Sequence, residues 1–411
     1  MTMAADAERR VRGAVRVLIY EPYPFGKIAG NLRTLLYILR FTDRDRLHLT
    51  LAVPFETPLV ERARGLGVDT VVVAPPDRVN RYGQRVLRDR WHGRLLTVPA
   101  MLAYNLRVRT LLRDHGIDVV YCNGIRALMT VAVAGLLTRT PLVWYVKGTL
   151  ENPILDRLGF FLADRILFFC ESNRDDKYPW LVHWFRRRVG IVKIGLDLEE
   201  IRSAEGAAAG AVARELSITA DTLGVAYLGQ LYAPKGVHHL VEAFARVASE
   251  FPAARLFLIG DPVLKEYGDY EPRLRELVAR LGLAERVVFT GWREDALAIV
   301  HHMAVVVHPS LAEGFGRAVL ESMALGRAVI ASRVGGLRET IRDGENGFLV
   351  DPADEGAIED RLRRLLSNGA LRERLGARAR ETVLADHLVE DKIAQLNAEW
   401  ERAARIPPEP R

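Results

Sequence analysis

Cysteine is almost absent from this chain of 411 residues, which contains only Cys122 and Cys170. Their separation fits no metal-binding pattern and two thiols cannot build a disulfide framework, so both a structural zinc site and a disulfide scaffold are disfavoured. The chain also lacks any apolar run near the ~20 residues that a membrane-spanning helix needs. The N-terminus MTMAADAERRVRG has no apolar signal region. We therefore expect a cytoplasmic protein.

A strong bias of charge is missing as well, because the formal net charge is only +6. This charge permits anionic substrates or a membrane surface. It does not indicate nucleic acid, since no basic motif rich in aromatic residues occurs. Apolar residues make up 49% of the chain and charged residues 27%, which is typical of soluble globular proteins. The length leaves room for two domains, each with its own core.

Short apolar runs alternate with helix-like segments through both halves of the chain. The strands are expected at 14–20, 47–53, 70–73, 118–121, 142–146, 165–169 and 189–193, and then at 225–227, 255–259, 287–289, 304–307, 328–331 and 348–350. The helices are expected at 31–40, 58–66, 80–115, 175–185, 237–250, 272–281, 355–366, 370–384 and 389–404, with one more ending near 137. This rhythm predicts an α/β protein with two doubly wound parallel sheets.

The domain limits are read from shifts in composition. We expect a flexible tail at 1–13, an N-terminal domain at 14–198, a polar and alanine-rich linker at 199–221 and a C-terminal domain at 222–385. The last stretch, 386–411, is expected to form a helix that packs back on the N-terminal domain.

The stretch from His308 to Gly336 predicts a strand, a glycine-rich turn and a helix. Glycines at 314 and 316 let the backbone approach a ligand closely, and the N-terminus of the helix suits a phosphate. Seven residues separate Glu313, on the loop, from Glu321, on the second helical turn. One carboxylate could then accept hydrogen bonds from sugar hydroxyls and the other from a ribose.

Three further loops follow strands of the same half. Lys235, behind the turn that begins with Gly229 and Gln230, could neutralise a phosphate as a point charge. Gly260 and Gly291 end the next two strands. A solvated lysine and simple turn glycines remain the alternative, but carboxyl ends of parallel strands share one edge, where ligands gather.

Five motifs carry a resemblance to a known family: GQLYAPKG, FTGW, HPSLAEGFGRAVLESMALGRAVIAS, VGGLRETI and DGENGFLVDP. Together they resemble the donor-binding half of a retaining glycosyltransferase of family four. The resemblance is strong over about 223–385 and weaker over 14–197. It implies the GT-B architecture, two facing Rossmann-like domains with the active site in the cleft between them.

The resemblance also implies roles for single residues. Glu313 would sit beside the donor sugar as a catalytic residue, Glu321 would hold the ribose and Lys235 the phosphates. The other implied donor-binding residues are Gly229, Gln230, Gly260, Gly291, Ser310, Gly314, Phe315 and Gly316. Members of the family usually need no metal or other cofactor, which agrees with the lack of an Asp-x-Asp motif between a strand and its following loop.

Several positions depart from the family pattern. Gln230 stands where relatives commonly have arginine, and Asn123 and Lys147 stand where many have histidine. Lys147 could supply positive charge near the reacting centre as a second catalytic residue, or it could be a surface lysine. The first loop keeps only Gly26 and Gly30 as glycines, so the acceptor side is defined less well than the donor side.

The implied reaction is the retaining transfer of a sugar from a nucleotide-diphosphate donor, with UDP-sugars expected first and GDP-sugars next. The acceptor is an unidentified glycan, glycolipid or small metabolite. A nucleotide-sugar epimerase of similar architecture and a non-catalytic nucleotide-sugar binder are the alternatives.

One basic, aromatic segment lies outside these motifs. Tyr178–Arg188 places Trp180, Trp184 and Phe185 beside three arginines, which suits an interfacial helix near anionic lipid. Aromatic residues four apart also pack into cores, so both interpretations stand. Peripheral contact with the inner face of a membrane is therefore a further hypothesis.

Overall fold

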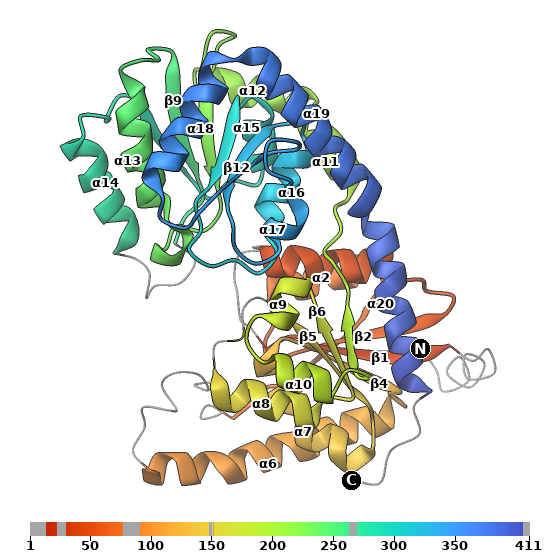
Figure 1. Cartoon of the computed structure of the whole chain (residues 1–411). Helices are drawn as coiled ribbons and strands as arrows, with labels where there is room; N and C mark the ends of the chain where they lie inside the picture. Colours follow the sequence, from red (N-terminus) through yellow and green to blue (C-terminus); the bar gives the residue numbers. More distant parts are fainter. Residues whose placement is uncertain are drawn as a thin grey trace. The chain divides into compact units, whose positions relative to one another are not determined.

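The computed structural model describes residues 14–22, 30–76, 91–147, 150, 152–262 and 269–405. The chain divides into two compact units, both visible in Figure 1. Unit 1 comprises Met1–Phe169, Arg174–Lys193 and Glu390–Arg411, and unit 2 comprises Cys170–Asn173 and Ile194–Val389. The last helix thus belongs to the unit formed by the first half of the chain.

Unit 1 is built on a seven-stranded parallel sheet with the order β3-β2-β1-β4-β5-β6-β7. Its strands are β1 (Val15–Tyr20), β2 (Leu47–Val53), β3 (Asp69–Val72), β4 (Val119–Asn123), β5 (Leu142–Val146), β6 (Arg165–Phe168) and β7 (Val189–Ile191). Its helices are α2 (Gly30–Phe41), α3 (Pro58–Gly65), α6 (Trp91–Asp114), α7 (Ile125–Thr138), α8 (Pro153–Leu162), α10 (Pro179–Trp184) and α20 (Val389–Ala404), and α9 (Glu171–Asp175) spans its boundary with unit 2.

The five inner strands of unit 1, β1, β2, β4, β5 and β6, are buried on both faces, as their nearly continuous apolar sequences require, whereas the edge strands β3 and β7 are partly exposed. Leu18, Val120 and Trp144 belong to the core cluster that includes residues of α6, α7, α8 and α10. Tyr121 points to the opposite face and contacts Trp400 of α20 edge to face, with ring centroids 5.4 Å apart. Helices therefore cover both sides of this sheet.

Unit 2 is built on a six-stranded parallel sheet with the order β10-β9-β8-β11-β12-β13. Its strands are β8 (Leu223–Leu228), β9 (Ala254–Ile259), β10 (Val287–Gly291), β11 (Val305–His308), β12 (Ala328–Ser332) and β13 (Phe348–Val350). Its helices are α11 (Leu198–Ala204), α12 (Ala207–Glu215), η1 (Ala233–Lys235), α13 (Val237–Ala248), α14 (Tyr270–Arg280), α15 (Ala296–His301), α16 (Arg317–Ala324), α17 (Leu337–Thr340), α18 (Glu355–Ser367) and α19 (Gly369–Asp386).

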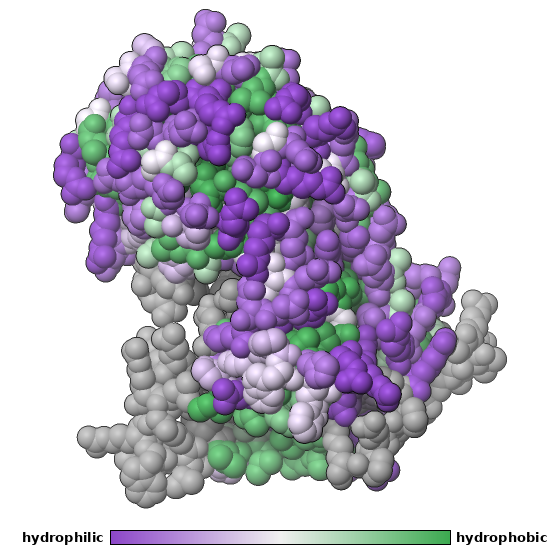
Figure 2. Space-filling view, in the orientation of Figure 1, coloured by the Kyte–Doolittle hydropathy of each residue, from purple (hydrophilic) through white to green (hydrophobic). Residues whose placement is uncertain are grey.

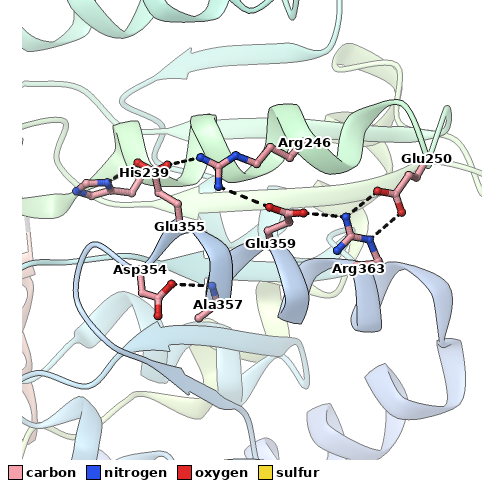
Figure 3. A network of polar contacts seen from close by, with 8 residues as sticks. All are labelled: His239, Arg246, Glu250, Asp354, Glu355, Ala357, Glu359 and Arg363. Carbon is pink, nitrogen blue, oxygen red and sulfur yellow. Dashed lines mark hydrogen bonds and ion pairs between the residues drawn. The ribbon is translucent and has the colours of Figure 1, made fainter.

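Apolar residues of α13, α14 and α18 share one core cluster with the sheet of unit 2. On the outer side of α13 and α18, charged residues form a ladder (Figure 3). Arg246 of α13 contacts Glu355 at 2.6 Å, and Arg363 of α18 contacts Glu250 at 2.7 Å. Each exposed ion pair of this kind contributes little to stability. The apolar faces of α13 and α18 therefore hold the two helices on the core, and the charged pairs help to align them.

The predicted α/β class with two Rossmann-like parallel sheets is confirmed. Most of the described elements begin and end within a few residues of the predicted limits, with several exceptions. The helix expected at 175–185 is shorter than predicted, because α9 ends at Asp175 and Pro179 starts the new helix α10. The short helices α8, α15 and α17 were not predicted. The stretch expected as a linker, 199–221, contains α11 and α12 and belongs to unit 2, because Ile201, Ala204 and Val212 are buried there.

Candidate active site

The candidate site of unit 2 lies where the strand order of its sheet reverses, between β8 and β11. Loops after neighbouring strands diverge at such a point and leave room for a ligand. Gly229, Gly260 and Gly291 end the adjacent strands β8, β9 and β10, and all three have positive φ. A Cβ on Gly260 would lie 1.9 Å from the Gly229 carbonyl oxygen, so this close approach requires glycine. At these three strand ends the backbone therefore carries no side chain that would keep a ligand away.

Glu313 is the centre of a polar cluster at this edge. Its Oε2 accepts hydrogen bonds from Lys235 Nζ at 2.5 Å, from Ser310 Oγ at 3.4 Å and, with the ring nitrogen as donor, from His308 Nε2 at 2.9 Å. Its Oε1 accepts from the Gly314 N–H at 3.2 Å. The side chains of Glu313 and Lys235 are only 13% and 14% exposed, so this is a nearly buried ion pair.

The ion pair determines the charge state of both partners. Burial alone would raise the pKa of Glu313, but the charge of Lys235 and the hydrogen bond with His308 hold that pKa well below its usual range. Burial would lower the pKa of Lys235, but the charge of Glu313, Tyr232 and the hydrogen bond with Glu313 together outweigh it and raise this pKa. Both groups are ionised at neutral pH. The ammonium has three N–H donors, so it can serve a second anion beside Glu313.

Tyr227 supports this cluster from the inside of β8. Its ring stacks on that of His308 with centroids 5.7 Å apart. Its hydroxyl donates to the Gln230 carbonyl at 2.7 Å, which fixes the turn that leads to Lys235. The side chain of Tyr227 is fully buried, and burial raises its pKa well above its usual value. It therefore acts as a neutral hydrogen-bond donor.

Helix α16 begins directly behind Glu313. Gly316 precedes it with φ of 86°, and a Cβ there would lie 2.2 Å from Leu337 Cδ2. The first N–H groups of a helix have no intrahelical partner and form the positive end of its dipole. Glu321 is buried on the second turn and accepts a hydrogen bond from Arg317 Nε at 2.8 Å. Phe315 is buried against His387, with ring centroids 5.5 Å apart.

The loop after β12 supports the glycine turn from behind. The Gly336 N–H donates to the Gly314 carbonyl at 3.0 Å. A Cβ on Gly335 would lie 2.0 Å from the Glu313 carbonyl oxygen. The VGG motif thus packs backbone against backbone and sets the position from which Glu313 projects.

The residues predicted for the acceptor side belong to unit 1. Asn123 ends β4 and is buried, and its Nδ2 donates to the buried carboxylate of Glu21, which follows β1. Lys147 follows β5 and is half-buried, and Gly30 is the exposed first residue of α2. Gly26 lies outside the described residues. Glu21, Asn123 and Lys147 thus lie at the carboxyl ends of β1, β4 and β5, which are adjacent strands.

Sequence reasoning missed four residues of these edges. His308 and Tyr227 could have been found from their positions at the carboxyl ends of β11 and β8. Arg317 lies four residues before Glu321, a spacing that pairs charges on a helix. Glu21 follows the first strand directly, and its polarity there was the signal.

No helix in the described ranges is both long and apolar enough to cross a membrane. The same ranges contain no group of three or more His, Cys, Asp or Glu side chains arranged to hold a metal ion.

Two family models match this chain. The model described as glycosyl transferases group 1 matches residues 213–382, and the model described as glycosyl transferase 4-like domain matches residues 57–190. Together the two models cover most of the chain, which therefore belongs to the glycosyltransferases of this group, and each of its two units has the Rossmann-like parallel sheet of a GT-B enzyme.

Among curated relatives, the lipopolysaccharide core biosynthesis glycosyltransferase LpsE of Rhizobium meliloti is 34% identical over 187 residues, which are 45% of this chain and 52% of that protein. The D-inositol 3-phosphate glycosyltransferase of Geodermatophilus obscurus is 35% identical over 226 residues, 51% of this chain and 48% of that protein. The chain thus spans about half the length of the curated relatives it matches.

Among solved structures, Anabaena HepE in complex with UDP and glucose is similar in fold. Its TM-score is 0.77 at 20% identity, and the match covers 95% of this chain and all of that one. At this identity the likeness concerns the fold.

Proposed function

We propose that this protein is a retaining glycosyltransferase that moves a sugar from a nucleotide-diphosphate donor to a carbohydrate, lipid-linked or small-molecule acceptor. The observation that carries the proposal is the Lys235–Glu313 pair beside the N-terminus of α16, at the reversal point of the sheet. A sugar diphosphate needs positive groups beside its phosphates and acceptors beside its hydroxyls. This cluster offers both within one hydrogen-bonded unit.

The division of roles follows from charge. Lys235 and the N-terminal N–H groups of α16 would stabilise the charge that develops on the leaving diphosphate. Glu313 would orient the sugar through its hydroxyls, and Glu321 would accept from the ribose. The bare glycine edge at 229, 260 and 291 would let the diphosphate lie against the backbone. Fixed positive groups then do the work for which other enzymes use a metal.

Retention requires the acceptor hydroxyl to arrive on the face that the diphosphate leaves. The bond from the anomeric carbon to the diphosphate breaks, the acceptor oxygen takes its place, and the leaving phosphate oxygen takes the acceptor proton. The protein mainly orients both substrates and stabilises charge. Asn123 and Lys147 are the proposed residues of the acceptor side.

UDP-sugars are the first donors to test, because the structurally similar HepE was crystallised with UDP and glucose. We also propose that the enzyme is cytoplasmic and contacts the inner face of a membrane peripherally. Family membership and the donor cluster support the transfer reaction, and the membrane contact rests on the surface of unit 1.

The test begins with a thermal-shift screen of UDP-, GDP-, ADP- and dTDP-sugars, since a ligand that binds only the folded state raises Tm. With the donor that binds, we expect turnover to survive chelation of divalent metals. Glu313→Gln and Lys235→Ala should each lower turnover by about 100-fold or more, because each removes a group aimed at the reacting charge.

Arg280→Gln, an exposed change on α14, is the matched control and should leave turnover unchanged. Near wild-type turnover in both site variants would contradict the site assignment. Release of free nucleotide without a new glycoside would contradict the transfer reaction.

A further inference from the structure

Unit 1 has an exposed apolar surface on α8, formed by side chains that are not buried in its core. On α8, Ile154, Leu158 and Phe161 recur at intervals of four and three residues, so they share one face of the helix. Ile154 is 70% exposed and Phe161 59% exposed. Burying such side chains would be favourable by the hydrophobic effect, so this face is suited to a partner.

A second exposed face lies beside the first. Trp180 and Trp184 are four residues apart on α10, and Trp184 is 75% exposed. Phe185, which follows α10, contacts Phe161 edge to face, with ring centroids 5.2 Å apart. This contact joins the two helices into one patch, defined here by Ile154, Leu158, Phe161, Trp180 and Trp184. Figure 2 shows pale and green residues over this part of unit 1, where Figure 1 places α8 and α10.

Basic side chains border the patch. From Lys177 to Arg188 the chain has four Lys and Arg side chains, including Arg186 and Arg187, and no carboxylate. The guanidinium carbon of Arg188 lies 5.6 Å from the centroid of the Phe185 ring. Arg157 of α8 similarly lies 5.7 Å from the ring of Tyr178. Arginine side chains therefore lie against the aromatic rings of Phe185 and Tyr178, which connect α8 and α10.

We propose that the patch on α8 and α10 docks the protein on an anionic lipid surface. Tryptophan rings prefer the boundary between water and hydrocarbon, where an apolar ring and a polar N–H are both accommodated. Arginine and lysine beside them bind lipid phosphates and anionic headgroups. An uncharged rim would suit another protein equally well, whereas this pairing of exposed indoles with an acid-free basic segment favours lipid. The patch contains no residue of the donor cluster.

The test uses the full chain and sedimentation with two kinds of vesicle, phosphatidylcholine alone and phosphatidylcholine mixed with an equal amount of phosphatidylglycerol. We expect binding to the anionic vesicles only, weakened by added salt. Trp184→Ser with Trp180→Ser should abolish most of the binding. The double substitution Arg186→Gln with Arg187→Gln should lower the partition coefficient for anionic vesicles by about fivefold for each charge removed.

Matched controls lie in unit 2. Leu384→Ser removes an exposed apolar side chain, and Arg280→Gln with Arg378→Gln removes two exposed charges. These variants should bind vesicles as the unmodified chain does. Thermal shifts with UDP should be the same in all of them, which separates this surface from the donor site and from any failure to fold.

Absence of sedimentation with anionic vesicles would overturn the proposal, as would equal binding by the patch variants and the controls. Concentration-dependent dimerisation that Trp184→Ser abolishes, without vesicle binding, would assign the patch to a second copy of the chain and would also overturn it.

Discussion

At the scale of single residues, Glu313 is held by donors from three separate segments of unit 2. Lys235 comes from the loop after β8, His308 from the end of β11, and Gly314 from the turn itself. An ionised, nearly buried carboxylate is tolerated only when its charge and lone pairs are satisfied in this way. Each partner therefore depends on the other, because removal of either one leaves the remaining charge nearly buried and unpaired.

A double-mutant cycle measures that dependence. Glu313→Gln and Lys235→Met should each lower the free energy of unfolding by about 3 kcal/mol, because each leaves a nearly buried charge without its partner. The double variant should lose less than the sum by about 1–3 kcal/mol. Chemical denaturation followed by circular dichroism gives these values. Simple additivity would show that the two residues do not interact.

The pKa shifts of Glu313 and Lys235 make the stability of the folded protein depend on pH. The pKa of Glu313 lies below its ordinary value of 4.5, so its stabilisation is present above pH 4.5 and is lost as pH falls through the lowered pKa. The pKa of Lys235 lies above 10.5, so its stabilisation is present below that pH and is lost as pH rises through the raised pKa. The stability difference between the unmodified chain and Glu313→Gln should therefore be constant around neutral pH and shrink as pH falls below 4.5. A difference that grew on acidification would contradict the assignment.

At the scale of elements, turns with special backbone angles position the donor cluster. Gly236 lies between Lys235 and α13 with φ of 64°, and a Cβ there would lie 2.1 Å from the Pro309 carbonyl oxygen. This contact ties the loop of Lys235 to the residue before Ser310. Gly282, at the end of α14, has φ of 69° but nothing within 4 Å of an added Cβ. The two glycines thus share a backbone conformation and differ in what surrounds them.

Substituting both glycines separates strain from position. Gly282→Ala should lower the free energy of unfolding by about 1 kcal/mol, because alanine is strained in the left-handed backbone conformation. Gly236→Ala should cost more, since the Pro309 backbone must move, and should also weaken the affinity for the donor. Isothermal titration with the donor found in the screen, together with unfolding curves, gives both quantities. Equal effects of the two substitutions would show that the Gly236–Pro309 approach has no role in the site.

At the scale of the whole molecule, the last helix, α20, belongs to the same unit as the first strands of the chain. The last helix, α20, inserts Trp400 against Tyr121 and pairs Glu399 with Arg165 at the start of β6. Trp400 is fully buried. Most of unit 2 lies between β7 and α20 in the sequence, so unit 1 is complete only once α20 has been made. A change in α20 is thus expected to act on unit 1.

Trp400→Ala tests this arrangement. It should destabilise unit 1 by about 3–5 kcal/mol, the usual cost of removing a buried aromatic side chain. Hydrogen exchange should increase in peptides from β4, β5 and β6, while β8, β11 and α16 keep their protection. Glu401→Ala breaks only the pair with the exposed Arg46 and should change exchange little. Equal loss of protection in both units would contradict the assignment of α20 to unit 1.

Much of the fold and half of the site could be predicted from local sequence. Apolar runs such as AVRVLIY and ARLFLI form parallel strands because buried strands need continuous apolar residues. Glu313, Glu321 and Lys235 were predicted from glycine turns at strand ends, which are local signals. Helices α11 and α12 were taken for a linker because their short, alanine-rich sequences carry little periodicity. These two helices are part of unit 2, and their packing against its other elements determines their structure.

By itself, the sequence determined the strand and helix rhythm, the glycines of the donor edge and the charges placed beside them, because each depends on residues close together in the chain. Tertiary structure decided the pairings that span long stretches. Lys235 meets Glu313 across 78 residues, and Arg165 meets Glu399 across 234. It also decided that Trp184 is exposed while Trp400 is buried. No local pattern distinguishes these two tryptophans, because burial depends on which elements pack above a residue.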